Sequence, residues 1–269
     1  MLINFFGKRG SGKTTTINGQ LPNCKSPCVV VDILGNFNDS EYLHTSSISE
    51  ACELINSEIN DPINKPIVLK TGDPDLAVDF MSAALWEANG GTLVLDECDA
   101  FSFSDAPCFN ELISYGRNRN VDLITGCRRP AELHRNITAG ANKLFAFQTQ
   151  EPRDIQYFES TVFGKRAEKL MYLKPFHGLY LDYDKGTFGE YRIDKLGNLF
   201  ILSSSPINKD IENSRSEKPI ENQSPESTDE SGMGPEESIE HAAESGIRRL
   251  TSAKRSEQQD DSIESEEEL

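Results

Sequence analysis

The sequence of 269 residues lacks the long apolar segments that would place it in a membrane. No run approaches the roughly 18 apolar residues that a spanning helix needs. A signal peptide opens with a basic region followed by an apolar region. Residues 2–6 instead read as a strand, so we expect no signal peptide. We therefore expect a protein with no membrane span that works in the cytoplasm.

Cysteine and histidine are few and scattered. Only Cys24 and Cys28 are close together in sequence, and the histidines show no ligand spacing that would complete a metal site with them. The remaining cysteines fall within apparent core elements, which is typical of a reducing compartment. This distribution disfavours both a disulfide scaffold and a structural zinc site.

Basic residues are also in short supply. The chain has 27 Lys and Arg against 44 Asp and Glu, a net charge of −17. Affinity for the phosphate backbone of nucleic acids comes mainly from Lys and Arg, so this balance argues against broad electrostatic binding of DNA. Any contact with DNA would have to come from a few basic groups on particular loops.

Large apolar residues are nearly absent from Ser205 onward. Residues 205–269 hold 18 acidic and 7 basic residues, and are rich in Ser, Glu and Asp. Such a composition cannot bury enough apolar surface to fold, so we expect a disordered acidic tail. Residues 1–204 are long enough for one α/β domain with its own core.

What the chain does contain is a phosphate-binding loop directly after the first strand. Residues 7–14 match the pattern G-x-x-x-x-G-K-[ST] between a strand and a helix. The residues expected to bind a nucleoside triphosphate are Gly7, Lys8, Arg9, Gly10, Ser11, Gly12, Lys13, Thr14 and Thr15. Lys13 would reach the β- and γ-phosphates of ATP, and Thr14 would hold Mg²⁺ through its hydroxyl.

A second motif supplies the acids of such a site. Residues 92–97 read as a strand buried on both faces, with Asp96 at its carboxyl end and Glu97 next to it. Asp96 is expected near the metal held by Thr14. Glu97 is the candidate for polarising the attacking water, and the alternative is a solvated loop acid.

Strand and helix patterns alternate along the body, which predicts a doubly wound, mostly parallel sheet. Residues 178–183 and 188–193 predict a C-terminal β-hairpin. The helix over 49–59 is expected to open at Ser49, and the helix over 73–86 to bury Leu76, Phe80, Ala84 and Leu85. The other expected helices are 13–19, 106–115, a short one after Pro130, and 153–163; the other expected strands are 28–33, 66–69, 121–125 and 144–147.

The stretch from Tyr115 to Asp154 resembles the FtsK–HerA superfamily of hexameric DNA-pumping ATPases. Arg117 stands where that family has an arginine ahead of a strand, Arg129-Pro130 match its R-P, and residues 152–154 match its later P-R-D turn. With the phosphate loop and Asp96-Glu97, the resemblance covers residues 1–160. It implies a RecA-like P-loop core of the type with an additional strand and a catalytic glutamate.

The sequence departs from this family at one position. The family's glutamine, which senses the γ-phosphate, is replaced by Arg128. An arginine also binds phosphate, so Arg128 keeps a sensing role or faces a neighbouring subunit. Arg117 is the other candidate for an arginine finger acting in trans, which requires a ring. For Arg117 and Arg119 the alternative is a basic helix end that complements the helix dipole.

Within the superfamily, a core of this size resembles the genome-packaging ATPases of membrane-containing icosahedral viruses. This implies an ATP-driven translocase of double-stranded DNA, a homo-oligomer in the form of a hexameric ring, a capsid or portal-vertex partner, and a place in the host-cell cytoplasm or with the virion. Two alternatives stay open. One is an assembly ATPase similar to the zonula-occludens-toxin-like proteins of filamentous phages, and the other is a nucleotide-dependent switch without DNA translocation. The acidic tail would be a linker, a docking helix or a DNA mimic.

Overall fold

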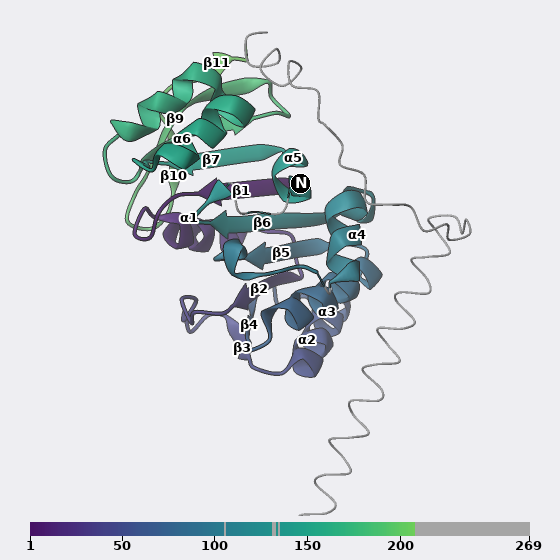
Figure 1. The fold of residues 1–269 in the computed structure, drawn as a ribbon. Coiled ribbons are helices and arrows are strands. Elements are labelled where there is room, and N and C mark those ends of the chain that lie inside the picture. The colour runs from purple at the N-terminus through teal and green to yellow at the C-terminus, as the bar shows by residue number, and fades with distance from the viewer. Residues whose placement is uncertain (105, 131–132, 134, 208–269) are drawn as a thin grey trace, which may run out of the picture. The chain divides into compact units, whose positions relative to one another are not determined.

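The computed structural model describes residues 1–104, 106–130, 133 and 135–207, and these residues form one mixed sheet with helices packed on it (Figure 1). The strands are β1 (Leu2–Phe6), β2 (Cys28–Asp32), β3 (Leu43–Thr45), β4 (Ile67–Lys70), β5 (Gly91–Leu95), β6 (Val121–Cys127), β7 (Lys143–Phe147), β8 (His177–Asp182), β9 (Thr187–Ile193), β10 (Leu199–Ile201) and β11 (Ser205–Pro206). The helices are α1 (Lys13–Gln20), α2 (Ile48–Asn60), α3 (Pro74–Glu87), α4 (Pro107–Tyr115), α5 (Arg135–Ala139) and α6 (Pro152–Phe158).

The order of the strands is that of a P-loop core with an additional strand. It runs β10-β9-β8-β7-β1-β6-β5-β2-β4-β3, with β11 beside β9. From β7 to β3 every neighbouring pair is parallel, and β6 lies between β1, which leads into the phosphate loop, and β5, which Asp96 follows. The expected fold class, a mostly parallel α/β sheet with an inserted strand, is therefore confirmed.

Two cores lie on the two faces of this sheet, because alternate residues of each strand point to opposite sides. In β2, Val29 and Val31 belong to the core that also contains residues of helices α2 to α6, whereas Val30 belongs to the core on the other face, with Ile17 of α1. All three valines are fully buried. The parallel strands are thus covered on both sides, as their continuous apolar sequences predict. Among the described residues, no helix is both long and apolar enough to cross a membrane.

The predicted C-terminal hairpin is present and extends the sheet beyond β7. β8 pairs antiparallel with β7, and β9 pairs antiparallel with β8. The short strands β10 and β11, which have no clear pattern in the sequence, both pair with β9. Because β11 is Ser205–Pro206, the ordered pairing extends two residues past the expected start of the tail. The rest of the expected tail, from residue 208, lies outside the described residues.

Two expectations about helices were wrong in detail. Helix α2 begins after Ser47, not Ser49, because the Ser47 side chain accepts a hydrogen bond from the Glu50 amide at 3.3 Å. The sequence Ser47-Ile48-Ser49-Glu50 matches the pattern of a capping box, which gives the sequence signal for this start. The helix expected over 153–163 is shorter than predicted: α6 ends at Phe158, and a single π-helical turn, Glu159–Phe163, follows.

Helix α3 buries a different face from the one predicted. Leu76 is 44% exposed, and Phe80 and Ala84 are only partly buried. The buried face instead consists of Ala77, Val78, Met81, Ser82, Leu85 and Trp86. Small residues let the helix approach the sheet closely, and the Ser82 hydroxyl stays satisfied by donating to the Val78 carbonyl at 2.7 Å. Of the predicted residues only Leu85 belongs to this face, and the prediction missed the buried Val78 and Met81.

Candidate active site

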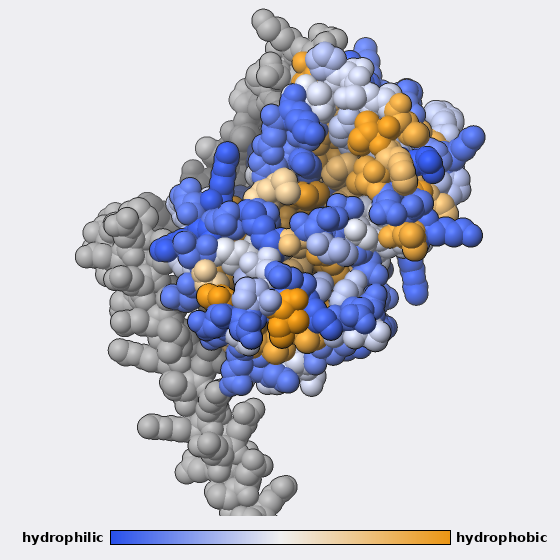
Figure 2. Space-filling model, turned by 180° about the vertical axis from the view of Figure 1, so that it is seen from behind, coloured by the Kyte–Doolittle hydropathy of each residue, from blue (hydrophilic) through white to orange (hydrophobic). Residues whose placement is uncertain are grey.

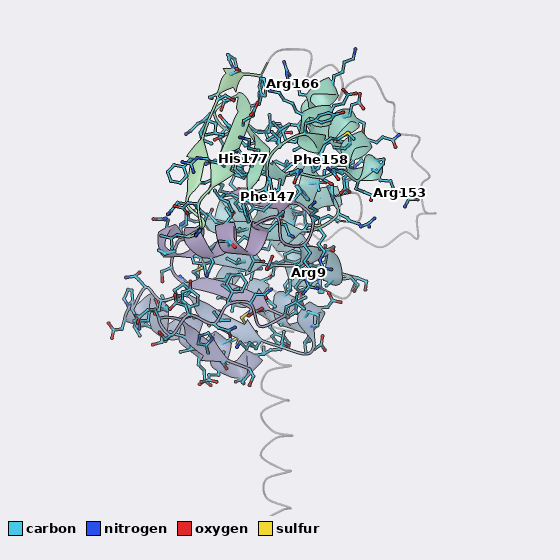
Figure 3. The ribbon with its side chains drawn as sticks, turned by 90° about the vertical axis from the view of Figure 1, so that its left-hand side faces the viewer. Arg9, Phe147, Arg153, Phe158, Arg166 and His177 are labelled. Atoms are coloured by element: carbon cyan, nitrogen blue, oxygen red, sulfur yellow. The ribbon has the colours of Figure 1, made fainter. Side chains whose placement is uncertain are left out.

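The phosphate loop joins the carboxyl end of β1 to the start of α1. Its backbone curls at Gly10 and Gly12, whose φ angles of +77° and +107° are rarely open to other residues. The Gly7 amide donates to the Cys127 carbonyl of the neighbouring strand β6 at 3.1 Å, which fixes the start of the loop to the sheet. Figure 3 looks onto this edge of the sheet and labels Arg9 of the loop. The loop therefore lies where parallel α/β sheets bind their ligands.

Lys13 is held inside the loop. Its side chain is only 4% exposed, and Nζ donates to the Gly7 carbonyl at 2.8 Å and the Lys8 carbonyl at 3.5 Å. The Ser11 hydroxyl is buried inside the same loop and has no hydrogen-bond partner. Lys8, Arg9 and Thr15 are exposed. An ammonium group, an unpaired hydroxyl and the N-terminal end of α1 together form a positive site that suits phosphate.

Thr14 and Asp96 meet across the two motifs. The Thr14 hydroxyl donates to Asp96 Oδ2 at 2.6 Å, and Asp96 is 3% exposed. Burial raises the pKa of Asp96, and the hydrogen bond from Thr14 partly opposes that shift. The other carboxylate oxygen, Oδ1, is buried without a partner. A hydroxyl beside a carboxylate oxygen with no hydrogen bond is a donor set that fits Mg²⁺.

Glu97 is buried next to Asp96 and is not a solvated loop acid. It is 6% exposed and has a φ of +55°, in the left-handed region that few non-glycine residues adopt. Its carboxylate accepts a hydrogen bond from Nε of Arg128, whose side chain is 44% exposed. The Arg128 amide in turn donates to Asp99 at 3.1 Å. The structure therefore places Arg128 at the phosphate-loop edge of its own chain, in contact with the candidate catalytic acid.

Gly126 is a site residue that the sequence analysis missed. A Cβ atom at this position of β6 would lie 2.4 Å from Asp96 Oδ1 and 2.8 Å from Cδ1 of Ile17. The Asp96 carboxylate, the candidate metal ligand, therefore fits only because residue 126 has no side chain. An isolated glycine inside an apolar strand is a sequence signal for such a close approach.

We expect Gly126→Ala to weaken the binding of Mg²⁺ with nucleotide by about tenfold or more, because the added methyl group pushes the Asp96 carboxylate away from Thr14. Calorimetric titration with MgATP measures this change, and urea unfolding measures any loss of stability. Gly72→Ala is the matched control, since a Cβ at Gly72 would meet nothing within 4 Å. Equal MgATP affinity of the two variants would contradict the role of Gly126.

Arg117 lies at the opposite edge of the sheet from the phosphate loop. It belongs to the turn Gly116–Arg119, which precedes the amino end of β6, whereas the loop follows the carboxyl end of the parallel strand β1. The seven residues of β6 separate the two edges by about 20 Å. Arg117 is exposed there, while Arg119 stacks on Trp86 with its guanidinium 5.0 Å from the ring centre. Arg117 and Arg128, both candidate finger residues, are thus not brought together.

The remaining motif residues of the resemblance surround the same edge as the loop. Arg129 and Pro130 follow β6, and residues 152–154 form the first turn of α6. Asp154 is buried there and accepts a hydrogen bond from the Thr149 hydroxyl at 3.3 Å, so it has a structural role in this turn. Arg153 is exposed (Figure 3).

Comparison with solved structures shows which known proteins share this fold. The genome-packaging NTPase B204 from Sulfolobus turreted icosahedral virus 2, in complex with ATPγS, matches with a TM-score of 0.57 and 18% identity over 70% of this chain and 95% of B204. Its AMP complex matches with a TM-score of 0.56 and 18% identity over 75% of this chain and 96% of that one.

A second virus provides a similar match. B204 from Sulfolobus turreted icosahedral virus, a DNA-packaging ATPase, matches with a TM-score of 0.57 and 16% identity over 70% of this chain and 95% of that one. No protein-family model and no curated protein matches the sequence. These likenesses confirm the fold that the sequence resemblance implies.

Proposed function

We propose that this protein is an ATP hydrolase of the FtsK–HerA type that moves double-stranded DNA into a preformed viral capsid. The observation that carries the proposal is the meeting of Thr14 with Asp96 at 2.6 Å, beside the buried Glu97. This arrangement combines a phosphate loop, a metal-binding pair and a candidate catalytic acid at one edge of the sheet. The shared fold with B204, which is named as a genome-packaging NTPase, supports the biological role.

In this proposal the loop binds the triphosphate and the pair holds the metal. The Lys13 ammonium exchanges its carbonyl partners for phosphate oxygens, and the amides at the start of α1 donate to them. Thr14 and Asp96 would hold Mg²⁺, which neutralises charge on the β- and γ-phosphate oxygens when bound. The raised pKa of the buried Asp96 carboxyl reflects a desolvation cost that a bound cation offsets.

Glu97 and Arg128 would act on the far side of the γ-phosphate. Glu97 accepts a proton from, and orients, the attacking water. Arg128 uses only Nε to bind Glu97, and its two terminal nitrogens remain as further donors for a phosphate oxygen. Arg128 would thus take the position of the family's glutamine and sense the γ-phosphate in its own chain.

Arg117 would serve the site of the next subunit. Since it lies at the opposite edge of its own sheet, it has no route to the phosphates bound by its own loop. Head-to-tail packing of identical subunits places one edge of each sheet against the opposite edge of the next, and closure of such contacts gives a ring. We propose a hexamer with Arg117 as the finger in trans.

The test of DNA translocation is the effect of DNA on ATP hydrolysis. We expect double-stranded DNA to stimulate steady-state turnover of the full-length protein more strongly than single-stranded DNA does, and the ring to contact it through a few basic groups facing the pore. Stimulation would fall as salt rises, because counterion release drives such contacts. A preference for single-stranded DNA would favour the filamentous-phage type of ATPase, and ATPase activity indifferent to DNA would favour the nucleotide switch.

The partner at the capsid and the place in the cell follow from the same proposal. A packaging ring would dock on a capsid or portal-vertex protein, in the host cytoplasm or on the virion. Co-sedimentation of the purified protein with empty capsids is the measurement, and failure to bind capsids while retaining DNA-stimulated activity would leave translocation without packaging.

A further inference from the structure

Two segments from the end of the described chain pack against the phosphate loop. A Cβ atom at Gly12 would lie 2.5 Å from Cδ1 of Ile193 and 3.2 Å from Cδ1 of Phe176. Ile193 ends β9, and Phe176 immediately precedes β8. Figure 3 labels His177, the neighbour of Phe176, on the same edge of the sheet as Arg9. Gly12, which precedes Lys13 of the phosphate loop, is therefore covered by an aromatic ring and an aliphatic side chain.

Phe176 is both exposed and fixed in place. Its side chain is 50% exposed and its φ is +63°, a conformation that is strained for a bulky residue. Its carbonyl accepts a hydrogen bond from the Ile193 amide at 3.0 Å, and the His177 amide donates to the Lys174 carbonyl at 3.1 Å. The backbone thus holds an aromatic face in solvent beside the phosphate loop. Strained residues of this kind cluster at ligand-binding sites.

The turn between β9 and β10 lies against α1, the helix that follows the phosphate loop. Asp194 accepts hydrogen bonds from the Leu196 and Asn198 amides, each at 2.9 Å, which fixes the turn. A Cβ at Gly197 would lie 1.9 Å from the Thr15 carbonyl, so only glycine permits this contact with α1. Leu196 is 76% exposed. Figure 2, which shows the opposite side from Figure 1, has apolar side chains gathered over the C-terminal strands, at its upper right.

The order of the strands gives the direction in which a bound nucleotide runs. Its terminal phosphates point from Lys13 toward Asp96 and Glu97, which follow β5, and β5 lies on the β6 side of β1. The nucleoside must therefore leave the loop on the other side of β1, where β7, β8 and β9 lie. Phe176 and Ile193 stand at that side of the loop, where both contact Gly12.

We propose that Phe176 is the platform on which the nucleobase stacks. The inference deepens the proposed function and rests on it, since it assigns the base end of the same ATP site. Every base has an aromatic face, so a stacking platform binds bases through area and not through hydrogen-bond pattern. Purine triphosphates should accordingly bind more tightly than pyrimidine triphosphates.

The experiment compares a ligand that has a base with one that lacks it. Full-length wild type and Phe176→Ala are titrated calorimetrically with MgATP and with magnesium tripolyphosphate. Loss of one base–aromatic stack should weaken MgATP binding about tenfold, while tripolyphosphate affinity stays unchanged. Alanine keeps the same backbone strain as phenylalanine, so the loop conformation is tested under equal conditions. Phe200→Ala is the control, because Phe200 is 41% exposed but stacks on Arg192, on the neighbouring strand.

A second variant gives a positive signal. In Phe176→Trp the new indole should retain MgATP affinity, and ATP should quench its fluorescence where tripolyphosphate does not. Wild type, with Trp86 alone, supplies the background. Unchanged MgATP affinity in Phe176→Ala, or equal losses for both ligands, would overturn the platform while leaving the ATP site in place. Wild type that binds neither ligand would overturn the proposed function and the platform with it.

Discussion

Glu97→Gln is expected to slow ATP hydrolysis by about 100- to 10,000-fold, the usual contribution of a general base, while the protein still binds MgATP. Glutamine has the same shape and can still accept a hydrogen bond from Arg128, so the fold and the phosphate loop stay intact. It cannot take a proton from water. The left-handed backbone at Glu97 and the ion pair with Arg128 fix the position of the carboxylate. The loss of hydrolysis should therefore come from the missing carboxylate oxygen.

Single-turnover hydrolysis measures the chemical step of Glu97→Gln, and calorimetry measures its affinity for MgATP. Glu87→Gln is the control for removal of one negative charge, because Glu87 is an exposed residue at the end of α3. Normal turnover by Glu97→Gln would show that the catalytic assignment is wrong. Loss of binding together with turnover would instead show that Glu97 supports the nucleotide site.

Mixing two inactive variants is expected to restore ATP hydrolysis. Lys13→Ala removes the ammonium that binds the phosphates and should weaken nucleotide binding about 100-fold. Arg117→Ala should keep binding but lose turnover, because the finger is absent from the next subunit's site. In a mixed ring, the intact phosphate loop of an Arg117→Ala subunit can meet the intact Arg117 of a neighbouring Lys13→Ala subunit. With equal amounts and free exchange of subunits, up to about a quarter of the interfaces regain both parts.

A second mixture of variants distinguishes the roles of Arg117 and Arg128. Lys13→Ala mixed with Arg128→Ala should stay inactive if Arg128 serves its own chain, where it contacts Glu97. Lys165→Ala, an exposed lysine away from the loop, is the control for loss of a positive charge. No recovery in the Lys13→Ala and Arg117→Ala mixture would contradict a trans finger. Recovery in the Arg128 mixture would exchange the roles of the two arginines.

The parts of this site that are contiguous in sequence could be predicted. The loop from Gly7 to Thr14 and the pair Asp96-Glu97 each carry their chemistry within a few residues, and their strand contexts are local patterns. Most helix and strand positions could also be predicted, because they too depend on local patterns in the sequence. The wrong face of α3 shows the limit of this reasoning, since apolar residues occur nearly all round this helix and do not by themselves define one stripe.

The parts made by distant segments could not be predicted. Gly126 matters only because β6 pairs with β5 and brings it against the Asp96 carboxylate. Phe176 contacts Gly12 because β8 and β9 extend the sheet beyond β7, and no local pattern reports such a contact. Likewise the Arg128–Glu97 ion pair joins two strand ends that are adjacent in space and far apart along the chain.

The position of β1 inside the sheet has a consequence for how the protein folds during its synthesis. β1 is synthesised before both of its partners, β6 and β7, and in the folded sheet Phe6 pairs with Cys127 and Ala146. A nascent chain must keep Leu2 to Phe6, a strongly apolar segment, without its native neighbours until those strands emerge. Unpaired strands in incomplete chains are prone to aggregate. The strand that leads into the phosphate loop thus gains its neighbours only when β6 and β7 have emerged, and this protein most needs a chaperone during that interval.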